Sequence, residues 1–166
     1  MAGSSKSAGL VSWLVVILLT TMTATAEDSG FKHAVPDEAT QATSRKLVAE
    51  MFREEYKNAT TAEARTALAR EMVDVAADTK DDPTARYVLL RIGLNVAVQA
   101  ADVDVALRAV DSLNSEYRVD GPAMKVDVLS KLAKGKRTRA QSEALLSPLG
   151  SLYRETLAAE KYDLAE

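Results

Sequence analysis

The sequence contains few residues that could act as a catalytic base, a nucleophile or a zinc ligand. It has one histidine, His33, and no cysteine. Zinc sites on a helix need two imidazoles on one face, and thiol catalysis needs a cysteine. A general base also needs a partner that orients it, and the serine and aspartate context around His33 does not indicate a triad. We therefore expect no catalytic residue, no metal ligand and no cofactor.

Two groups of acidic residues invite comparison with a calcium-binding loop and with a catalytic carboxylate pair, and neither fits. Asp78, Asp81 and Asp82 lack the alternate spacing and the glycine bend of a calcium-binding loop. A helix end followed by a capping carboxylate explains them better. The carboxylates of Glu54 and Glu55 point about 100° apart around a helix, so they do not face one substrate bond together. Both groups are expected to be structural.

The basic residues gather in one stretch near the C-terminal end of the sequence. Nucleic-acid sites usually combine such cations with aromatic side chains on a basic surface. No aromatic residue is interleaved here, and the formal net charge is −3. We expect this stretch to be a solvated loop between helices, with no nucleic-acid partner. The competing hypothesis is that the loop binds an anion or nucleic acid. The residues are Lys131, Lys134, Lys136, Arg137 and Arg139.

The elements that position these residues are expected to be helices. Ala, Leu, Glu, Lys and Arg dominate, glycine and proline are scarce, and the alternating pattern of strands is missing. Apolar residues recur instead at helical spacing. The sequence predicts an all-α fold of about six antiparallel helices, stacked as helical hairpins and joined by tight caps.

Capping residues predict where these helices begin. Pro36–Asp37 is a start signal for a first helix that runs to about Tyr56, and Thr60 with Glu63 forms a capping box for the second. The other signals are Asp82–Pro83 for the third helix, Asp102 or Asp104 for the fourth, Asp120–Gly121–Pro122 for the fifth, and a kink or restart at Ser147–Pro148 in the last.

The third helix is apolar over most of its circumference. Its apolar positions are Tyr87, Leu90, Leu94, Ala97 and Val98. A helix that is apolar nearly all round is usually packed between other helices. We expect this helix to be the central element of the fold.

The first 26 residues have the organisation of a secretory signal peptide. Lys6 supplies a positive charge, Leu10–Leu19 is an apolar run, and Ala24 and Ala26 form a small-residue cleavage motif. Cleavage after Ala26 is favoured because the run is shorter than the about 20 residues of a membrane span, and an uncleaved anchor is the alternative. We expect an exported protein (periplasmic, cell-surface or extracellular) with a helical signal peptide at 1–26, a polar lead-in at 27–40 and a helical domain at 41–166.

The segment Ala101–Val110 resembles the hairpin corner of a tetratricopeptide repeat. Ala106 and Val110 match two packing positions of that family, while Ala101 stands where glycine is usual. Residues Glu160–Ala165 repeat the corner pattern, with Tyr162 and Ala165 at the aromatic and alanine positions. The resemblance implies a tetratricopeptide-like α-solenoid. Because the sequence stops within a second hairpin, we expect the domain to be truncated at its C-terminal end.

A second resemblance covers Lys46–Glu166, and Ala77–Arg91 above all. This stretch is similar to a helical segment near the N-terminus of large exported proteins of planctomycete-type bacteria. The resemblance implies a signal peptide, a helical domain and then further modules, such as laminin-G-like or carbohydrate-binding-module-like units. It implies no activity and no catalytic residues.

These observations favour an exported, non-enzymatic helical-repeat module that binds a protein or peptide partner. The alternative is an accessory helical region of a longer exported enzyme or ligand-binding protein, whose functional domain lies beyond residue 166. We expect no cofactor and no small-molecule substrate, and contact with a membrane only through the N-terminal segment if it stays uncleaved.

Overall fold

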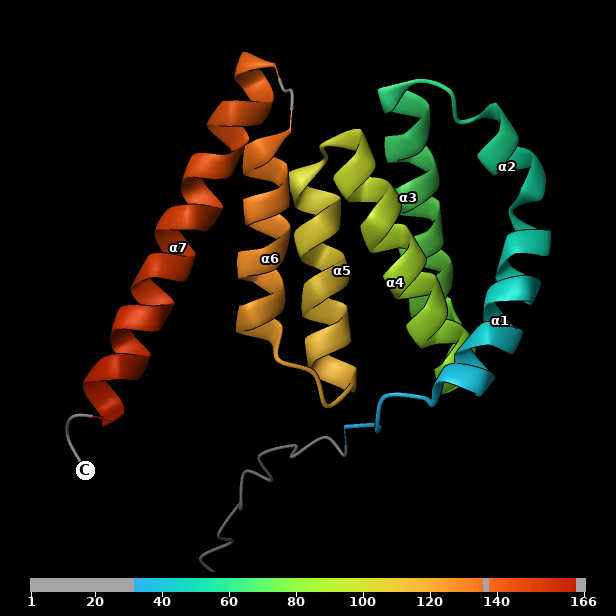
Figure 1. Ribbon diagram of the computed structural model, residues 1–166, viewed down its shortest axis with the longest axis horizontal. Helices are drawn as coiled ribbons and strands as arrows, with labels where there is room; N and C mark the ends of the chain where they lie inside the picture. The colour runs from blue at the N-terminus through green and yellow to red at the C-terminus, as the bar shows by residue number, and fades with distance from the viewer. Residues whose placement is uncertain (1–31, 136–137, 164–166) are drawn as a thin grey trace, which may run out of the picture.

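The computed structural model describes residues 32–135 and 138–163, and within the last helix it leaves aside the side chains of Tyr153 and of residues 155–163. The predicted signal peptide, with Ala24 and Ala26, lies outside the described residues. The described part of the chain forms seven α-helices, so the prediction of an all-α fold is confirmed (Figure 1). They are α1 (Glu38–Met51), α2 (Arg53–Asn58), α3 (Ala62–Asp78), α4 (Pro83–Ala100), α5 (Val103–Glu116), α6 (Gly121–Lys134) and α7 (Arg139–Asp163).

Aspartate side chains begin four of these helices. Asp37, Asp82, Asp102 and Asp120 each accept a hydrogen bond from the backbone N–H three residues later, at distances of 2.9, 2.9, 3.0 and 2.9 Å. Each bond satisfies one of the N–H groups that a helix leaves unpaired in its first turn. The predicted starts at Asp37 and Asp82 are confirmed, and Asp102, not Asp104, caps α5.

The predicted boundaries of the first two helices need correction. The first helix begins at Glu38, inside the stretch predicted as a lead-in to residue 40, and it is interrupted at Phe52. Phe52 leaves regular helical geometry, at φ −102° and ψ 20°, and its side chain is only 3% exposed, so burial in the core outweighs helix continuity there. Thr61, not Thr60, caps α3 by accepting a hydrogen bond from Ala64 N–H.

Of the two alternatives predicted for the last helix, the restart at Ser147 is wrong and the kink at Pro148 stays a prediction. α7 passes through Pro148 as one helix, so there is no restart with Ser147 as its cap. Proline removes one helical hydrogen bond, and the residue whose carbonyl loses it, Ala144, is exposed to water. The helix also continues to Asp163, through the start of the predicted corner Glu160–Ala165, where neither glycine nor proline ends it.

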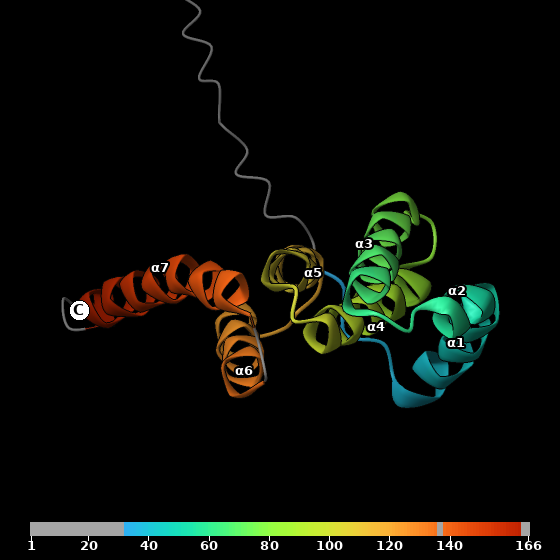
Figure 2. The same cartoon turned by 90° about the horizontal axis from the view of Figure 1, so that it is seen from above.

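α4 is the central element, as its composition predicts. It contacts α1, α3, α5 and α6. Consecutive helices from α2 to α7 pack against each other, and the alternate pairs α3 with α5, α4 with α6, and α5 with α7 also touch. Figure 2 shows α3 and α5 on one side of the row and α1, α4 and α6 on the other. The core therefore runs along the row and passes through α4.

A glycine sets how closely α3 and α4 approach each other. A Cβ atom on Gly93 would lie 3.1 Å from Val73 Cγ2, 3.3 Å from Met72 Cβ and 3.3 Å from the carbonyl oxygen of Ala69. These distances are tighter than ordinary van der Waals contact between carbon atoms. The absence of a side chain at Gly93 therefore lets the two helices pack at short range.

Tyr117 connects the end of α5 to the start of α4. Its side chain has no exposed surface, and its hydroxyl donates a hydrogen bond of 2.7 Å to the carbonyl oxygen of Pro83. Its ring packs edge-on against Tyr87, with the centroids 5.1 Å apart. The buried phenol thus has both a polar partner and an aromatic partner, which is how Tyr is usually accommodated in a core.

The lead-in is attached to the same point. His33 N–H donates to the carbonyl of Glu116 at 2.7 Å, and Arg118 N–H donates to the carbonyl of His33 at 2.9 Å, which forms an isolated parallel β-bridge. An ion pair between Arg86 and Glu116 also joins α4 to α5. The N-terminal lead-in, α4 and α5 therefore meet around Tyr117.

Replacing Tyr117 by Phe tests the hydrogen bond from the Tyr117 hydroxyl to the carbonyl oxygen of Pro83. Burial raises the pKa of Tyr117 to about 12. In the unfolded chain the Tyr117 phenol ionises near its ordinary pKa of 10.0. Between pH 10.0 and about 12 the unfolded chain therefore loses this proton while the folded chain keeps it, and the free energy of unfolding falls as the pH rises. We expect Tyr117→Phe to lower stability by about 1 kcal/mol at neutral pH and to reduce that alkaline loss. Urea unfolding followed by circular dichroism measures both.

Tyr87→Phe is the matched control, because the Tyr87 hydroxyl makes no hydrogen bond within the described residues. It should lose less stability than Tyr117→Phe. Equal losses for the two variants would show that the hydroxyl of Tyr117 contributes nothing of its own.

Backbone strain at Ala101, the residue that ends α4, can be tested by substitution. Ala101 lies in the left-handed region, at φ 56° and ψ 32°, which costs an L-residue about 1–2 kcal/mol. Glycine adopts this geometry without strain, but it also raises the conformational entropy of the unfolded chain, which offsets part of the gain. We expect Ala101→Gly to raise the free energy of unfolding by about 0.5–1 kcal/mol, measured by urea unfolding. The control Ala67→Gly, on the exposed face of α3, should lower it by about 1 kcal/mol. A loss of stability in both variants would contradict the assignment of strain to Ala101.

Candidate partner-binding groove

A stripe of polar side chains runs along the exposed face of α4. Arg91, Asn95 and Gln99 follow one another at four-residue intervals, and all three are exposed. Most residues between them on the helix, including Leu94 and Ala97, are buried, and Ile92 and Val98 are partly buried. Four-residue spacing places side chains one above another on one helical face. These three are the exposed residues of the central helix.

The stripe borders a hollow of about 300 Å³ between α4 and α6. Apolar side chains from both helices line it, among them Val98, Met124 and Val128. On the α6 side, Lys131 Nζ lies 2.7 Å from an Asp127 carboxylate oxygen, so these two charges compensate each other. The hollow therefore combines apolar surface with a polar edge, as binding sites usually do.

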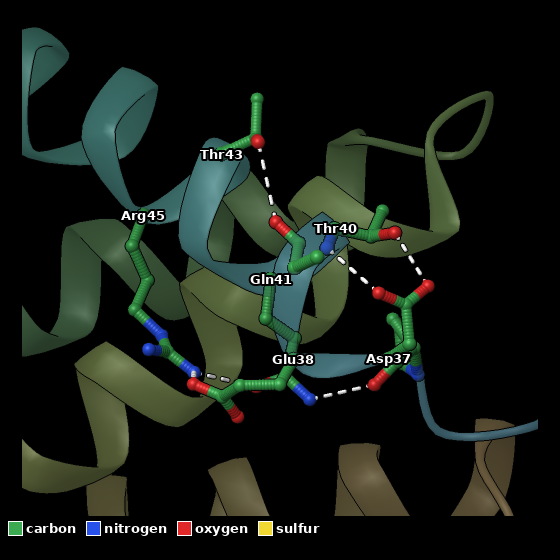
Figure 3. A network of polar contacts seen from close by, with 8 residues as sticks. Asp37, Glu38, Thr40, Gln41, Thr43 and Arg45 are labelled. Atoms are coloured by element: carbon green, nitrogen blue, oxygen red, sulfur yellow. Dashed lines mark hydrogen bonds and ion pairs between the residues drawn. The ribbon is translucent and has the colours of Figure 1, made fainter.

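A second hollow, of about 330 Å³, lies on the other side of the stripe, between α4 and α1. Arg91 and Asn95 line both hollows. On the α1 side, Arg45 Nη2 donates to Glu38 Oε1 at 3.0 Å and to Gln41 Oε1 at 2.9 Å (Figure 3). We call the two hollows and the stripe between them the α4 groove.

The α1 wall of the groove is held by a network at the helix start. Gln41 Nε2 donates to the carbonyl of Pro36 at 2.7 Å, and Asp37 accepts from the Thr40 backbone N–H and hydroxyl (Figure 3). The hydrogen bond from the Thr40 hydroxyl is the main cause of the lowered pKa of Asp37. Because these polar groups hold one another, the wall is ordered before any ligand arrives.

The polar stripe itself has no such partners. Across residues 32–135 and 138–163, the side chains of Arg91, Asn95 and Gln99 make no hydrogen bond and no ion pair. A guanidinium offers five N–H donors, and each carboxamide offers both a donor and an acceptor. These groups can bind and orient a ligand, but none of them is a nucleophile or a base near neutral pH.

The residues that the sequence singled out for hairpin packing divide into two groups. Ala106 and Val110 lie on α5 with no exposed surface, within the core. Tyr162 belongs to α7, but its side chain is not among those described, and Ala165 lies outside the described residues. The structure therefore brings only Ala106 and Val110 together, in the core and away from the groove.

The single histidine lies outside the groove as well. His33 is exposed, and its ring centroid is 5.9 Å from that of Tyr117. Within the described segments, no three His, Asp or Glu side chains gather in a way that could hold a metal ion. Asp82, from the acidic segment, caps α4.

The basic stretch predicted as a loop is only partly described. Lys131 pairs with Asp127, and Arg139 pairs with Glu143 at 2.9 Å, both one turn apart on their helices. Lys136 and Arg137 lie outside the described residues. None of the helices in the described segments has the length and apolar character that crossing a membrane requires.

The groove is not among the sites predicted from the sequence. The apolar residues of α4 predict a central helix, and the four-residue spacing of Arg91, Asn95 and Gln99 is the signal in the sequence that points to a polar stripe on it. Comparison of the chain with protein-family models, with curated proteins and with solved structures finds no match. The groove therefore rests on the geometry of this chain alone.

Unpartnered side chains should be dispensable for folding. We expect Arg91→Gln, Asn95→Ala and Gln99→Ala each to change the free energy of unfolding by no more than about 0.5 kcal/mol. Leu94→Ala, in the buried face of the same helix, should cost about 2–5 kcal/mol. Urea unfolding compares the four variants. A loss of more than about 1 kcal/mol in a stripe variant would assign that side chain a structural role.

Proposed function

We propose that the chain is an exported, non-enzymatic helical-repeat module that binds a protein or peptide partner in the α4 groove. The observation that carries this proposal is the stripe of Arg91, Asn95 and Gln99, which lies between two hollows and has no partner within the described chain. Polar side chains that the fold does not use, placed beside apolar surface, are the arrangement expected of a recognition surface.

The packing order of the helices supports the repeat part of the proposal. In a stack of helical hairpins, each helix touches the next helix and also the one after it. The contacts of α3 with α5, α4 with α6, and α5 with α7 follow this order, whereas α1 departs from it by packing on α4. Such stacks present an extended concave surface to their partners. The two hollows of the α4 groove are the hollows of the described chain that the central helix borders with unpartnered polar side chains.

Export is supported by the sequence alone. The charged start, apolar run and small-residue motif of residues 1–26 are the features of a secretory signal peptide. The absence of cysteine is compatible with export, because a helical domain of this size can fold on its core without disulfides. The partner is therefore sought among exported proteins.

Site-specific crosslinking tests the proposal, because the chain has no cysteine of its own. Asn95→Cys places a unique thiol in the groove, and a benzophenone maleimide attached there captures whatever lies against α4. Arg70→Cys, exposed on α3, is the control position. After exposure to the exported proteins of the producing cell, we expect a crosslinked species from position 95 that is absent from position 70.

The identity of the species is then checked by competition. Unlabelled chain should suppress the crosslink at position 95, whereas chain carrying Asn95→Trp, which fills the groove, should not. Crosslinking of equal yield and composition at positions 95 and 70 would refute the groove as the binding site.

A further inference from the structure

The charges that line the α4 groove do not balance. Three cations, Arg45, Arg91 and Lys131, face two carboxylates, Glu38 and Asp127. Arg45 pairs with Glu38 at 3.0 Å, and Lys131 pairs with Asp127 at 2.7 Å. Among the described residues, Arg91, at the centre of the groove, is the lining cation that forms no ion pair. A ligand that fills the groove therefore meets one open guanidinium and no open carboxylate.

A guanidinium in this state selects a planar anion. Arginine binds a carboxylate through two parallel N–H bonds, and charge-assisted bonds of this kind are roughly twice as strong as neutral ones. A polyanion such as nucleic acid fits poorly, because Glu38 and Asp127 stand on the two walls and the formal net charge of the chain is −3. The charge pattern favours a single carboxylate at Arg91.

The spacing of the stripe matches an extended peptide. Residues four apart on a helix are separated by about 6 Å along its axis. Alternate residues of an extended chain, whose backbone groups face the same side, are separated by about 6.6 Å. Asn95 and Gln99 each carry a donor and an acceptor on one carboxamide, which can pair with the N–H and C=O of a peptide backbone. From Arg91 to Gln99 the stripe spans about 12 Å, the length of about four extended residues.

Resting on the proposed function, we infer that the α4 groove binds an extended peptide segment that carries a carboxylate at Arg91. Asn95 and Gln99 hold the peptide backbone, and the apolar wall formed by Val98, Met124 and Val128 receives one apolar side chain of the ligand. The carboxylate belongs either to an Asp or Glu side chain or to the C-terminus of the peptide. Both sources present the same chemistry to the guanidinium.

Selection from a library of random linear peptides on the purified chain tests this inference. Enriched peptides are synthesised and their affinities measured by fluorescence anisotropy. We expect each enriched peptide to contain a carboxylate without which it does not bind. Arg91→Gln should weaken binding about 10- to 100-fold, while Arg70→Gln, on α3, should leave it unchanged. Arg91→Lys should restore only part of the affinity, because an ammonium cannot form the two parallel bonds.

Two peptide variants identify the source of the carboxylate. If amidation of the C-terminus abolishes the effect of Arg91→Gln, the terminal carboxylate is the group bound. If Asp→Asn or Glu→Gln abolishes that effect, a side chain is bound. Either result supports the inference.

The failure of the inference is distinct from the failure of the proposed function. One outcome would overturn the inference and leave the groove as a binding site. In that outcome the enriched peptides need no carboxylate and bind Arg91→Gln as well as the unchanged chain, but a label on Asn95→Cys displaces them. A library that yields no binder would overturn the inference but not the proposed function, which includes folded protein partners. Peptides that bind the chain but are indifferent to a label at position 95 would overturn both.

Discussion

The hydrogen bond from the Tyr117 hydroxyl to the Pro83 carbonyl is the interaction on which the arrangement of this protein depends. A buried phenol without a partner would cost about 1–3 kcal/mol, so this bond favours the arrangement in which the end of α5 lies beside the start of α4. The same residue borders the β-bridge through which His33 attaches the lead-in. The side chain of Tyr117 joins α5 to α4, and the backbone on either side of Tyr117 joins the lead-in to the same point.

This constraint matters for function because it fixes the position of α4. The central helix is buried against α3 and α5 on one side, with Gly93 allowing the close approach to α3. Its remaining face emerges between α1 and α6 and carries Arg91, Asn95 and Gln99. A helix packed this way has little freedom to move, so a peptide bound along it would lose little affinity to reordering of the site.

The helix starts were largely predictable because capping is local. An aspartate and the N–H three residues later lie within one turn, so Asp37 and Asp82 could be identified without knowledge of the fold. The choice between adjacent residues was not predictable: Thr61 caps α3 in place of Thr60. The break at Phe52 was missed for a different reason, since the local apolar pattern continues through it and its backbone geometry, at a residue buried in the core, is visible only in the structure.

The sequence by itself determined the all-α class and the central place of α4, because periodicity and apolar content act within a single helix. Only the tertiary structure decided the α4 groove, the partnership of Tyr117 with Pro83 and the compensation of Arg45 by Glu38. The hollows depend on distances between α1, α4 and α6, which no periodic pattern contains. Whether Arg91 keeps an open charge likewise depends on which carboxylates the fold brings near it, and in residues 32–135 and 138–163 none forms an ion pair with it.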